Sequence, residues 1–255
     1  MPNHITTKIE FYGQQGNIDK VLDLIKGEGE CIDFNKIIPM PESLNIESGS
    51  TTDRAIAYYV TERLTIPVEQ TNLNALISNM FDRNWAYEVV RRLAESAKTE
   101  SAEEMEKLYN MGKQYMLNRE NYGFYTWYDW CRVNWGTKWN AYDCMLDKDG
   151  NVIEFDTAWS CPIPVLDALA ELCDEHDVYF IGKWADEDSG HNVGTFESDC
   201  CADGCLFNYE HVENGSNEAY EIYIELKGES NCIGKDEDGN WVHYDCDSCP
   251  NANIC

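Results

Sequence analysis

The sequence predicts an α+β fold, because segments with the two-residue apolar alternation of strands are interspersed with segments that have the three- and four-residue spacing of amphipathic helices. The chain has 255 residues, which is enough for a substantial core, and 43% of them are hydrophobic, as in globular proteins. We therefore expect a folded protein that mixes helices and strands.

The chain opens with a predicted strand, helix and second strand. The first strand covers residues 4–13, and the second covers residues 31–38 and is stopped by the prolines that follow. Between them lies a short amphipathic helix with Asn17 as its N-cap and Gly27 beyond its end. The buried faces would comprise Ile5, Thr7, Ile9 and Phe11 on the first strand, and Ile18, Val21, Leu22 and Ile25 on the helix.

Residues 62–120 are predicted to form a helical insertion of about three helices. Ser101 and Glu104 make the capping-box pattern in front of the third helix. The three apolar stripes comprise Leu73, Leu76, Ile77 and Met80, then Tyr87, Val90, Leu93 and Ala94, and finally Met105, Leu108, Met111, Tyr115 and Met116.

Four further elements complete the predicted order. A hairpin turns at Asp149-Gly150, a helix opens at Pro162, and residues 178–181 form a short apolar strand. Residues 220–226 show the clearest two-residue alternation in the chain and are predicted to be a strand. The whole order is that of an elaborated ferredoxin-like fold.

We expect residues 1–230 to form one ferredoxin-like domain with the insertion at about 62–120. Residues 231–255 are expected to form an acidic, cysteine-rich tail that packs on this domain or extends from it. The sequence has no internal repeat and no linker rich in proline or serine, so it gives no indication of a further division into domains.

The charge balance is strongly acidic. The 19 Lys and Arg residues stand against 47 Asp and Glu residues, so the formal net charge is −28. This field repels nucleic acids and anionic membranes and attracts basic surfaces. Residues 1–120 contribute −6, residues 121–196 contribute −10 and residues 197–255 contribute −12, so we expect a basic partner to meet the C-terminal half.

The start of the chain lacks the basic residues and apolar run of a signal peptide, and no apolar stretch is long enough for a membrane helix. We therefore expect a cytoplasmic protein. The 12 cysteines are too sparse for a disulfide scaffold and should mostly be thiols or metal ligands in a reducing cytosol.

The densest aromatic segment spans residues 122–142 and carries charged residues between its rings. Tryptophan combines a large apolar body with one polar handle, so such rings build a core, a ligand cleft or a partner surface. The candidate binding residues are Trp127, Trp130, Trp135 and Trp139 with Asp129 and Asp143, together with Asp186 and Asp188 of the loop at 186–194.

Six short sequence blocks along the chain resemble, in the same order, those of the YubB ferredoxin-like family, whose members are carried by plasmids, phages and their bacterial hosts. The blocks are residues 2–5, 34–41, 125–130, 134–142, 155–160 and 185–188. The resemblance implies a ferredoxin-like fold in a protein of a mobile genetic element and supplies no catalytic residues. The segment after Glu197 departs from the pattern, as does Cys161.

Cysteines gather near the C-terminus, where Cys246 and Cys249 form a CxxC pair and Cys201 and Cys205 offer a second pair. Four such thiolates suit a structural zinc ion. The spacing is irregular, so free thiols and disulfides remain open as alternatives. No catalytic residue is assigned.

Two segments resemble calcium loops, Asp147–Asn151 and Asp236–Asn240. When each glycine is placed at position 6 of an EF-hand loop, position 1 is Met145 or Gly234 and position 12 is an aspartate. Both segments are therefore interpreted as tight turns between strands.

Two functions from different classes follow. The first is a non-enzymatic interaction protein whose acidic surface engages a basic host protein. Its most specific form is inhibition of a nucleic-acid-directed defence protein by nucleic-acid mimicry. Such mimicry is physically reasonable because carboxylates and phosphates both present anionic oxygens to Arg and Lys. The second is a metal- or ligand-dependent enzyme with its site at the Trp-rich segment and the Asp186–Gly194 loop. A structural subunit that is merely kept soluble by its charge is a third possibility.

Overall fold

The computed structural model describes residues 3–29, 31–63, 87–147, 149, 151–201, 204–230 and 232–244. The chain divides into two compact units. The sheet unit comprises Met1–Pro39 and Cys131–Cys255, and the helical unit comprises Met40–Trp130.

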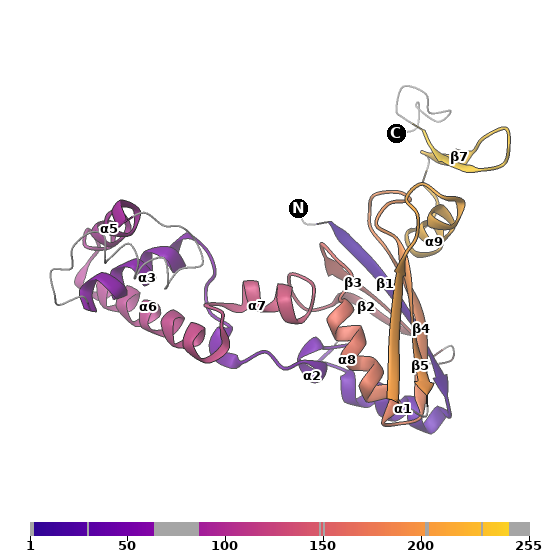
Figure 1. Ribbon diagram of the computed structural model, residues 1–255, viewed down its shortest axis with the longest axis horizontal. Coiled ribbons are helices and arrows are strands. Elements are labelled where there is room, and N and C mark those ends of the chain that lie inside the picture. The colour runs from indigo at the N-terminus through magenta and orange to yellow at the C-terminus, as the bar shows by residue number, and fades with distance from the viewer. Residues whose placement is uncertain are drawn as a thin grey trace. The chain divides into compact units, whose positions relative to one another are not determined.

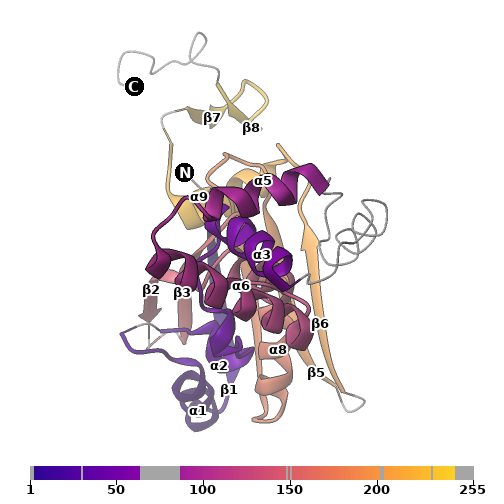
Figure 2. The ribbon, with the colours of Figure 1, turned by 90° about the vertical axis from the view of Figure 1, so that its left-hand side faces the viewer.

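The sheet unit is built on a six-stranded antiparallel sheet in the order β2-β3-β1-β4-β5-β6. In Figure 2, β2 and β3 lie toward one side of this sheet and β5 and β6 toward the other. Apart from the short helices and the helical unit that stand between α1 and β2, the elements from β1 to β4 have the order β-α-β-β-α-β, which is the ferredoxin-like order. The strands are β1 (His4–Gly13), β2 (Tyr142–Asp147), β3 (Val152–Ala158), β4 (Val178–Ala185), β5 (Gly194–Cys201) and β6 (Gly204–His211).

Helices α1 (Gln15–Ile25) and α8 (Ile163–Asp174) belong to the β-α-β-β-α-β core of the sheet unit (Figure 1). Strand side chains alternate between the two faces of a sheet, and on the covered face they are buried. The buried strand residues include Ile5, Thr7, Ile9 and Phe11 on β1, and Ile153, Phe155 and Thr157 on β3. The predictions for β1, for the apolar face of α1 and for the helix after Pro162 are thus confirmed, although α1 takes Gln14 rather than Asn17 as its N-cap.

The prediction of a strand at residues 220–226 is wrong, because this segment lies within helix α9 (Asn217–Lys227). Ser216 caps the helix by accepting a hydrogen bond from the amide of Ala219, and Gly228 ends it at a φ of 85°. The apolar residues fit the spacing of a strand as well as that of a helix, but the N-cap and the set of residues buried at helical spacing show that the segment is a helix. That buried set is Ala219, Tyr220, Ile222, Tyr223 and Leu226.

The prediction of a strand at residues 31–38 is also wrong. The segment contains the short helix α2 (Phe34–Ile37), because the Asp33 carboxylate accepts a hydrogen bond from the amide of Asn35 and so starts a helical turn. Phe34 is fully buried and packs edge-to-face on Trp135. The second strand of the sheet is instead β2, which with β3 forms the hairpin predicted around Asp149.

The β5–β6 hairpin extends the sheet beyond β4 and was not predicted from the sequence. Two glycines make room for aromatic rings on the paired strands β4 and β5: a Cβ atom at Gly182 would lie 2.2 Å from the Phe196 ring, and one at Gly194 would lie 2.1 Å from the Trp184 ring. Trp184 and Phe196 stack with their ring centroids 6.3 Å apart. This close fit holds the hairpin against β4.

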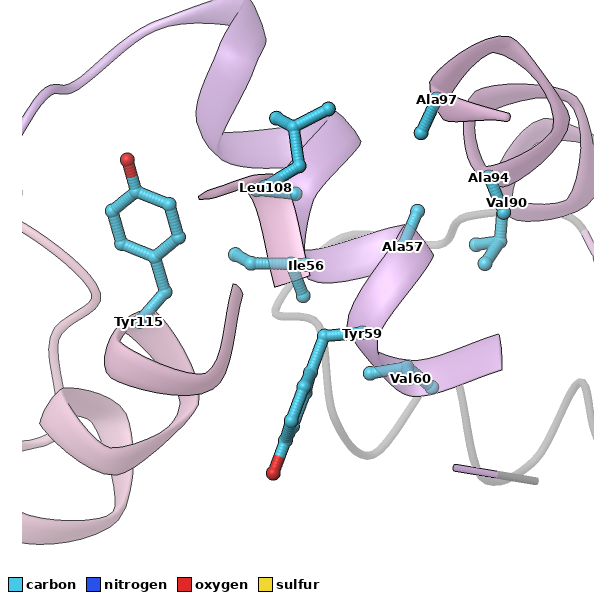
Figure 3. Close-up of a cluster of buried hydrophobic side chains, with 10 residues drawn as sticks. Ile56, Ala57, Tyr59, Val60, Val90, Ala94, Ala97, Leu108 and Tyr115 are labelled. Atoms are coloured by element: carbon cyan, nitrogen blue, oxygen red, sulfur yellow. The ribbon is translucent and has the colours of Figure 1, made fainter. Parts of the chain in front are cut away.

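The helical unit contains α3 (Ser50–Arg63), α5 (Tyr87–Ala97) and α6 (Ala102–Tyr122), preceded by the short helix η1 (Glu42–Leu44). The predicted capping box of Ser101 and Glu104 is confirmed. The predicted stripe from Leu73 to Met80 lies outside the described residues. The core residues labelled in Figure 3 come from all three helices: Ile56, Ala57, Tyr59, Val60, Val90, Ala94, Ala97, Leu108 and Tyr115.

Helix α7 (Trp127–Asn134) precedes β2, and a small sheet of β7 (Ile233–Lys235) and β8 (Trp241–His243) follows α9. The calcium-like segment Asp236–Asn240 is a turn, as predicted, in which the Asp236 carboxylate accepts hydrogen bonds from the amides of Asp238 and Asn240. The other segment, Asp147–Asn151, lies between the paired strands β2 and β3, but two of its five residues lie outside the described ranges. Within the described part of the chain, no helix is both long and apolar enough to cross a membrane.

Candidate functional site

The face of the sheet that carries α9 forms the candidate site, here called the acidic face. Helix α9 packs on one end of it, because Ala185 and Val193 share a buried cluster with the apolar side of α9. The remainder of this face is solvent-accessible. It presents seven carboxylates and three lysines: Glu10, Glu154, Asp156, Glu197, Asp199, Glu210 and Glu225, with Lys8, Lys183 and Lys227.

Strand register arranges these side chains in rows across the sheet, where neighbouring strands lie about 4.8 Å apart. One row crosses five strands and ends on β6, and a second row lies two residues further along each strand. The first row is Glu154, Lys8, Lys183, Thr195 and Glu210, and the second is Val152, Glu10, Ile181, Glu197 and Asn208.

The rows border a shallow pocket of about 490 Å³ that is shared by β1, β4, β5 and β6. Its charged and polar lining residues are Lys8, Glu10, Lys183, Thr195, Glu197, Asn208 and Glu210. The pocket therefore lies on the acidic face, at the junction between the ferredoxin-like strands and the added hairpin.

Glu225 of α9 neutralises both lysines of the pocket. Its two oxygens lie 3.0 Å from the Lys8 ammonium and 2.7 Å from the Lys183 ammonium, and Lys8 also lies 3.1 Å from Glu10. Burial tends to raise the pKa of Glu225, but the hydrogen bonds from Lys183 and Lys8 outweigh it and lower this pKa. The hydrogen bond from Lys8 likewise lowers the pKa of Glu10, while Glu225 raises the pKa of Lys8.

We expect the Glu225→Gln variant to be less stable at neutral pH by about 1 kcal/mol, the upper range for a partly exposed ion-pair network. A carboxylate with a lowered pKa stabilises the fold above its unfolded pKa and loses this effect as the pH falls through its folded pKa. The difference between variant and native chain should therefore vanish as the pH falls through and below about 4. Urea denaturation at several pH values measures it, and an undiminished difference in acid would contradict the role of the carboxylate charge.

The other carboxylates give the acidic face a net negative charge. Within the described ranges, neither Glu197 nor Glu210 has an ion-pair partner. Burial raises the pKa of Glu154, so this group gains protons more readily than its neighbours. After Glu225 has paired with the lysines, the outer part of the face, toward β6, stays negative.

An apolar element lies beside these charges. Tyr12 and Tyr179 stack with ring centroids 5.2 Å apart and stay 37% and 44% exposed, and Ile181 is 41% exposed. Exposed aromatic rings next to charges are typical of protein recognition surfaces. The Tyr12 hydroxyl donates a hydrogen bond to Glu10, which links this element to the acidic rows.

The four predicted tryptophans do not meet on one surface of the sheet unit. Trp127 and Trp130 belong to the helical unit and Trp135 and Trp139 to the sheet unit. Trp130 and Trp135 are buried, and the indole nitrogen of Trp135 donates to the Ile38 carbonyl. These two rings serve the core.

Trp139 is half-buried and has a different environment. The Lys138 ammonium lies 4.4 Å from the Trp139 ring centroid and 4.6 Å from that of Trp159, so the lysine stacks on both rings. The rings thus hold a cation that the chain itself provides.

The aspartates predicted as binding residues also lie on different elements. Asp129 is exposed on α7, and Asp143 is exposed on β2 at a φ of 49°, next to a register shift. Asp186 is only 4% exposed, and its carboxylate accepts hydrogen bonds from Asn192 and from the amide of Asp188. It organises the loop after β4, from which Asp188 extends into solvent.

The predicted zinc ligands are only partly within the described structure. Cys201 ends β5 and Cys205 lies near the start of β6, whereas Cys246 and Cys249 lie outside the described residues. Among the described side chains, no three His, Cys, Asp or Glu residues are grouped to hold a metal ion. Burial raises the pKa of Cys131 to about 12 and also raises that of Cys161, so these thiols stay protonated.

Cys31 and Cys144 form a disulfide, so the expectation of thiols is wrong for this pair. The two Cα atoms lie 5.9 Å apart, within the range that a disulfide spans, and the bond joins the segment before α2 to strand β2. Their separation of 113 residues concealed the pairing from sequence reasoning.

Sequence reasoning also missed the pocket residues. Lys8, Glu10 and Glu197 alternate with buried residues on their strands, which is the pattern of any sheet with one solvated face. The pairing of β5 with β4 and β6 brings them together, and this pairing was not predicted. Only the excess of acids after residue 120 pointed to this region.

Residues 138–237 match the family model described as a ferredoxin-like domain in Api92-like proteins. This range contains β2 to β6 with α8 and α9 and confirms the ferredoxin-like fold class. The search of curated proteins finds no match. Among solved structures, the crystal structure of protein Api92 from Yersinia pseudotuberculosis is similar, with 11% identity, a TM-score of 0.39, and coverage of 84% of this chain and 99% of that chain.

Proposed function

We propose that this chain is a non-enzymatic interaction protein that binds a basic host protein through the acidic face. The observation that carries the proposal is the excess of carboxylates over lysines on one solvent-accessible sheet face, with both pocket lysines already paired to Glu225. Such a field steers a basic partner toward this face and fixes its orientation.

The sharpest form of the proposal is that the acidic face replaces nucleic acid on a nucleic-acid-handling protein of a bacterial defence system. Arginine and lysine side chains that contact phosphates also bind carboxylates in the same geometry. The family resemblance, which implies a phage- or plasmid-encoded protein acting in the host cytoplasm, supports this form. Direct nucleic-acid binding and membrane binding are not part of the proposal, because the net charge of −28 opposes both.

The enzyme hypothesis has weaker support from the geometry. Its site would need carboxylates with open coordination at the Asp186–Gly194 loop, but the Asp186 carboxylate accepts bonds from the loop itself. Of the four tryptophans assigned to the same site, Trp130 and Trp135 are buried and Trp139 stacks against Lys138.

A charge-reversal experiment tests the proposal. The double variant Glu197→Lys and Glu210→Lys reverses two carboxylates on adjacent strands of the acidic face. We expect it to lower the capture of basic and nucleic-acid-handling proteins from bacterial lysate by about tenfold or more, as for loss of two close charge pairs. Quantitative mass spectrometry at low and at moderate salt measures the captured amounts.

The matched control is Asp167→Lys with Glu171→Lys on the exposed side of α8, which changes the net charge by the same amount in the same unit. This control should retain the partner. Release of the captured protein by duplex DNA would favour mimicry. Recovery of no basic partner at either salt concentration, or an equal loss with both variants, would overturn the proposal.

A further inference from the structure

Strand β6 is an edge strand whose outer backbone groups can be assigned from the ladder. The amide of Val212 donates to the Val193 carbonyl, and in an antiparallel pair the hydrogen-bonded residues alternate. Register then places Glu210 and Asn208 in hydrogen-bonded pairs with Thr195 and Glu197. The residues between them, Phe207, Tyr209 and His211, direct their amides and carbonyls away from β5.

Within the described part of the chain, no strand pairs with this outer edge. The register of β5 and β6 runs without a shift over all eight residues, and β6 contains no proline. Natural sheets usually protect such an edge with a bulge, a proline or a very short strand. Strand β2, at the other edge, has such a device, because its register shifts between Tyr142 and Met145.

The two sides of β6 have different chemistry. Asn208 and Glu210 point to the acidic face beside Glu197 and Thr195. Phe207, Tyr209 and His211 point to the other side, where Phe207 and Tyr209 stack and Tyr209 stays 48% exposed. A strand added at this edge would therefore meet carboxylates on one side and aromatic rings on the other.

We propose that β6 receives an extended segment of the basic partner as a seventh strand, with Lys or Arg at alternate positions facing the acidic face and apolar residues between them. This inference rests on the proposed function and names the structural class of the bound segment. Main-chain hydrogen bonds would give affinity, and the alternating side chains would give specificity. A second copy of the chain is disfavoured as the occupant, since each copy carries a net charge of −28.

The antiparallel case makes a distinct prediction about which partner amides matter. Partner residues opposite Phe207, Tyr209 and His211 would exchange hydrogen bonds with β6, and these are the apolar ones. The basic residues opposite Asn208 and Glu210 would direct their amides outward. Affinity should thus depend on the amides of the apolar residues.

Three fluorescently labelled peptides of the length of β6, eight residues, test this inference. The parent alternates lysine and valine, the second carries N-methyl groups on the valine amides, and the third carries them on the lysine amides. We expect the parent and the lysine-methylated peptide to bind the native chain within about threefold of each other, and the valine-methylated peptide to bind at least about tenfold more weakly, because it loses the edge hydrogen bonds. Fluorescence anisotropy measures each affinity.

The outcomes separate this inference from the proposed function. If all three peptides bind equally, and the Glu197→Lys and Glu210→Lys variant still weakens them, the acidic face stands and the seventh strand is overturned. If lysine methylation alone weakens binding, the seventh strand is supported in the parallel sense. If the parent does not bind while the lysate experiment still yields a basic partner, the inference fails and the proposed function remains.

Discussion

Removal of the Cys31–Cys144 disulfide should destabilise the protein by about 2–4 kcal/mol, the usual range for a native disulfide. The bond has a sequence separation of 113 residues, and closing so long a loop removes much conformational entropy from the unfolded chain. It also fastens β2, the edge strand whose register shifts beside Cys144. The Cys31→Ser and Cys144→Ser double variant should therefore unfold at a lower urea concentration than the native chain.

The control is the native chain with a reducing agent, which should unfold like the double variant. The half-buried Cys232 offers a matched substitution, Cys232→Ser, outside the disulfide. Thiol trapping during lysis measures the oxidised fraction of this cysteine pair in the cell. Equal stability of the oxidised chain and the double variant would contradict a stabilising role.

The elements that the sequence predicted correctly are those in which local signals agree with the tertiary packing. In α1 the buried residues are the four at helical spacing, and in α6 the Ser101 and Glu104 side chains make both bonds of the capping box. In α9 the apolar spacing fitted a strand as well as a helix. Ser216 and Gly228 carried the deciding information at its two ends.

The acidic face could not be predicted in the same way, because its residues are adjacent only through strand pairing. Lys8 and Glu225 are separated by 217 residues, and Lys183 and Glu225 by 42. Nothing in either segment specifies that α9 packs on the face of β1 and β4. The sequence located the acidity in the C-terminal half, and the fold concentrates part of it on one sheet face.

The positions of the rings in the Trp-rich segment could not be predicted for a related reason. Composition shows that rings are dense, but their burial depends on the partners that the fold supplies. Trp135 meets Phe34 from a distant part of the chain, and Lys138 fills the space between Trp139 and Trp159. Which carboxylates lack an ion-pair partner in the described part of the chain, as Glu197 and Glu210 do, likewise depends on the fold.

The Gly112→Leu variant should lose the packing of the helical unit. Helices α3 and α6 approach so closely at this point that a Cβ atom on Gly112 would lie 2.2 Å from the Ala55 carbonyl oxygen and 2.7 Å from the Tyr59 Cβ atom. Both obstacles belong to the backbone or to the first side-chain atom, so neither can rotate away. A helix interior normally gains up to about 1 kcal/mol when glycine becomes alanine, yet here even Gly112→Ala should cost about 1–3 kcal/mol because of overpacking.

Hydrogen exchange with mass spectrometry gives a readout local to each helix. We expect Gly112→Leu to abolish the protection of amides in α3 and α6, and Gly112→Ala to lower it, because the core residues Ile56 and Tyr115 on these helices would be forced apart. Gly16→Ala on α1 is the matched control, since nothing lies within 4 Å of its added Cβ atom and no loss of protection should follow. Full protection of α3 and α6 in Gly112→Leu would contradict the close approach of the two helices, since packing this tight leaves no space for a leucine side chain.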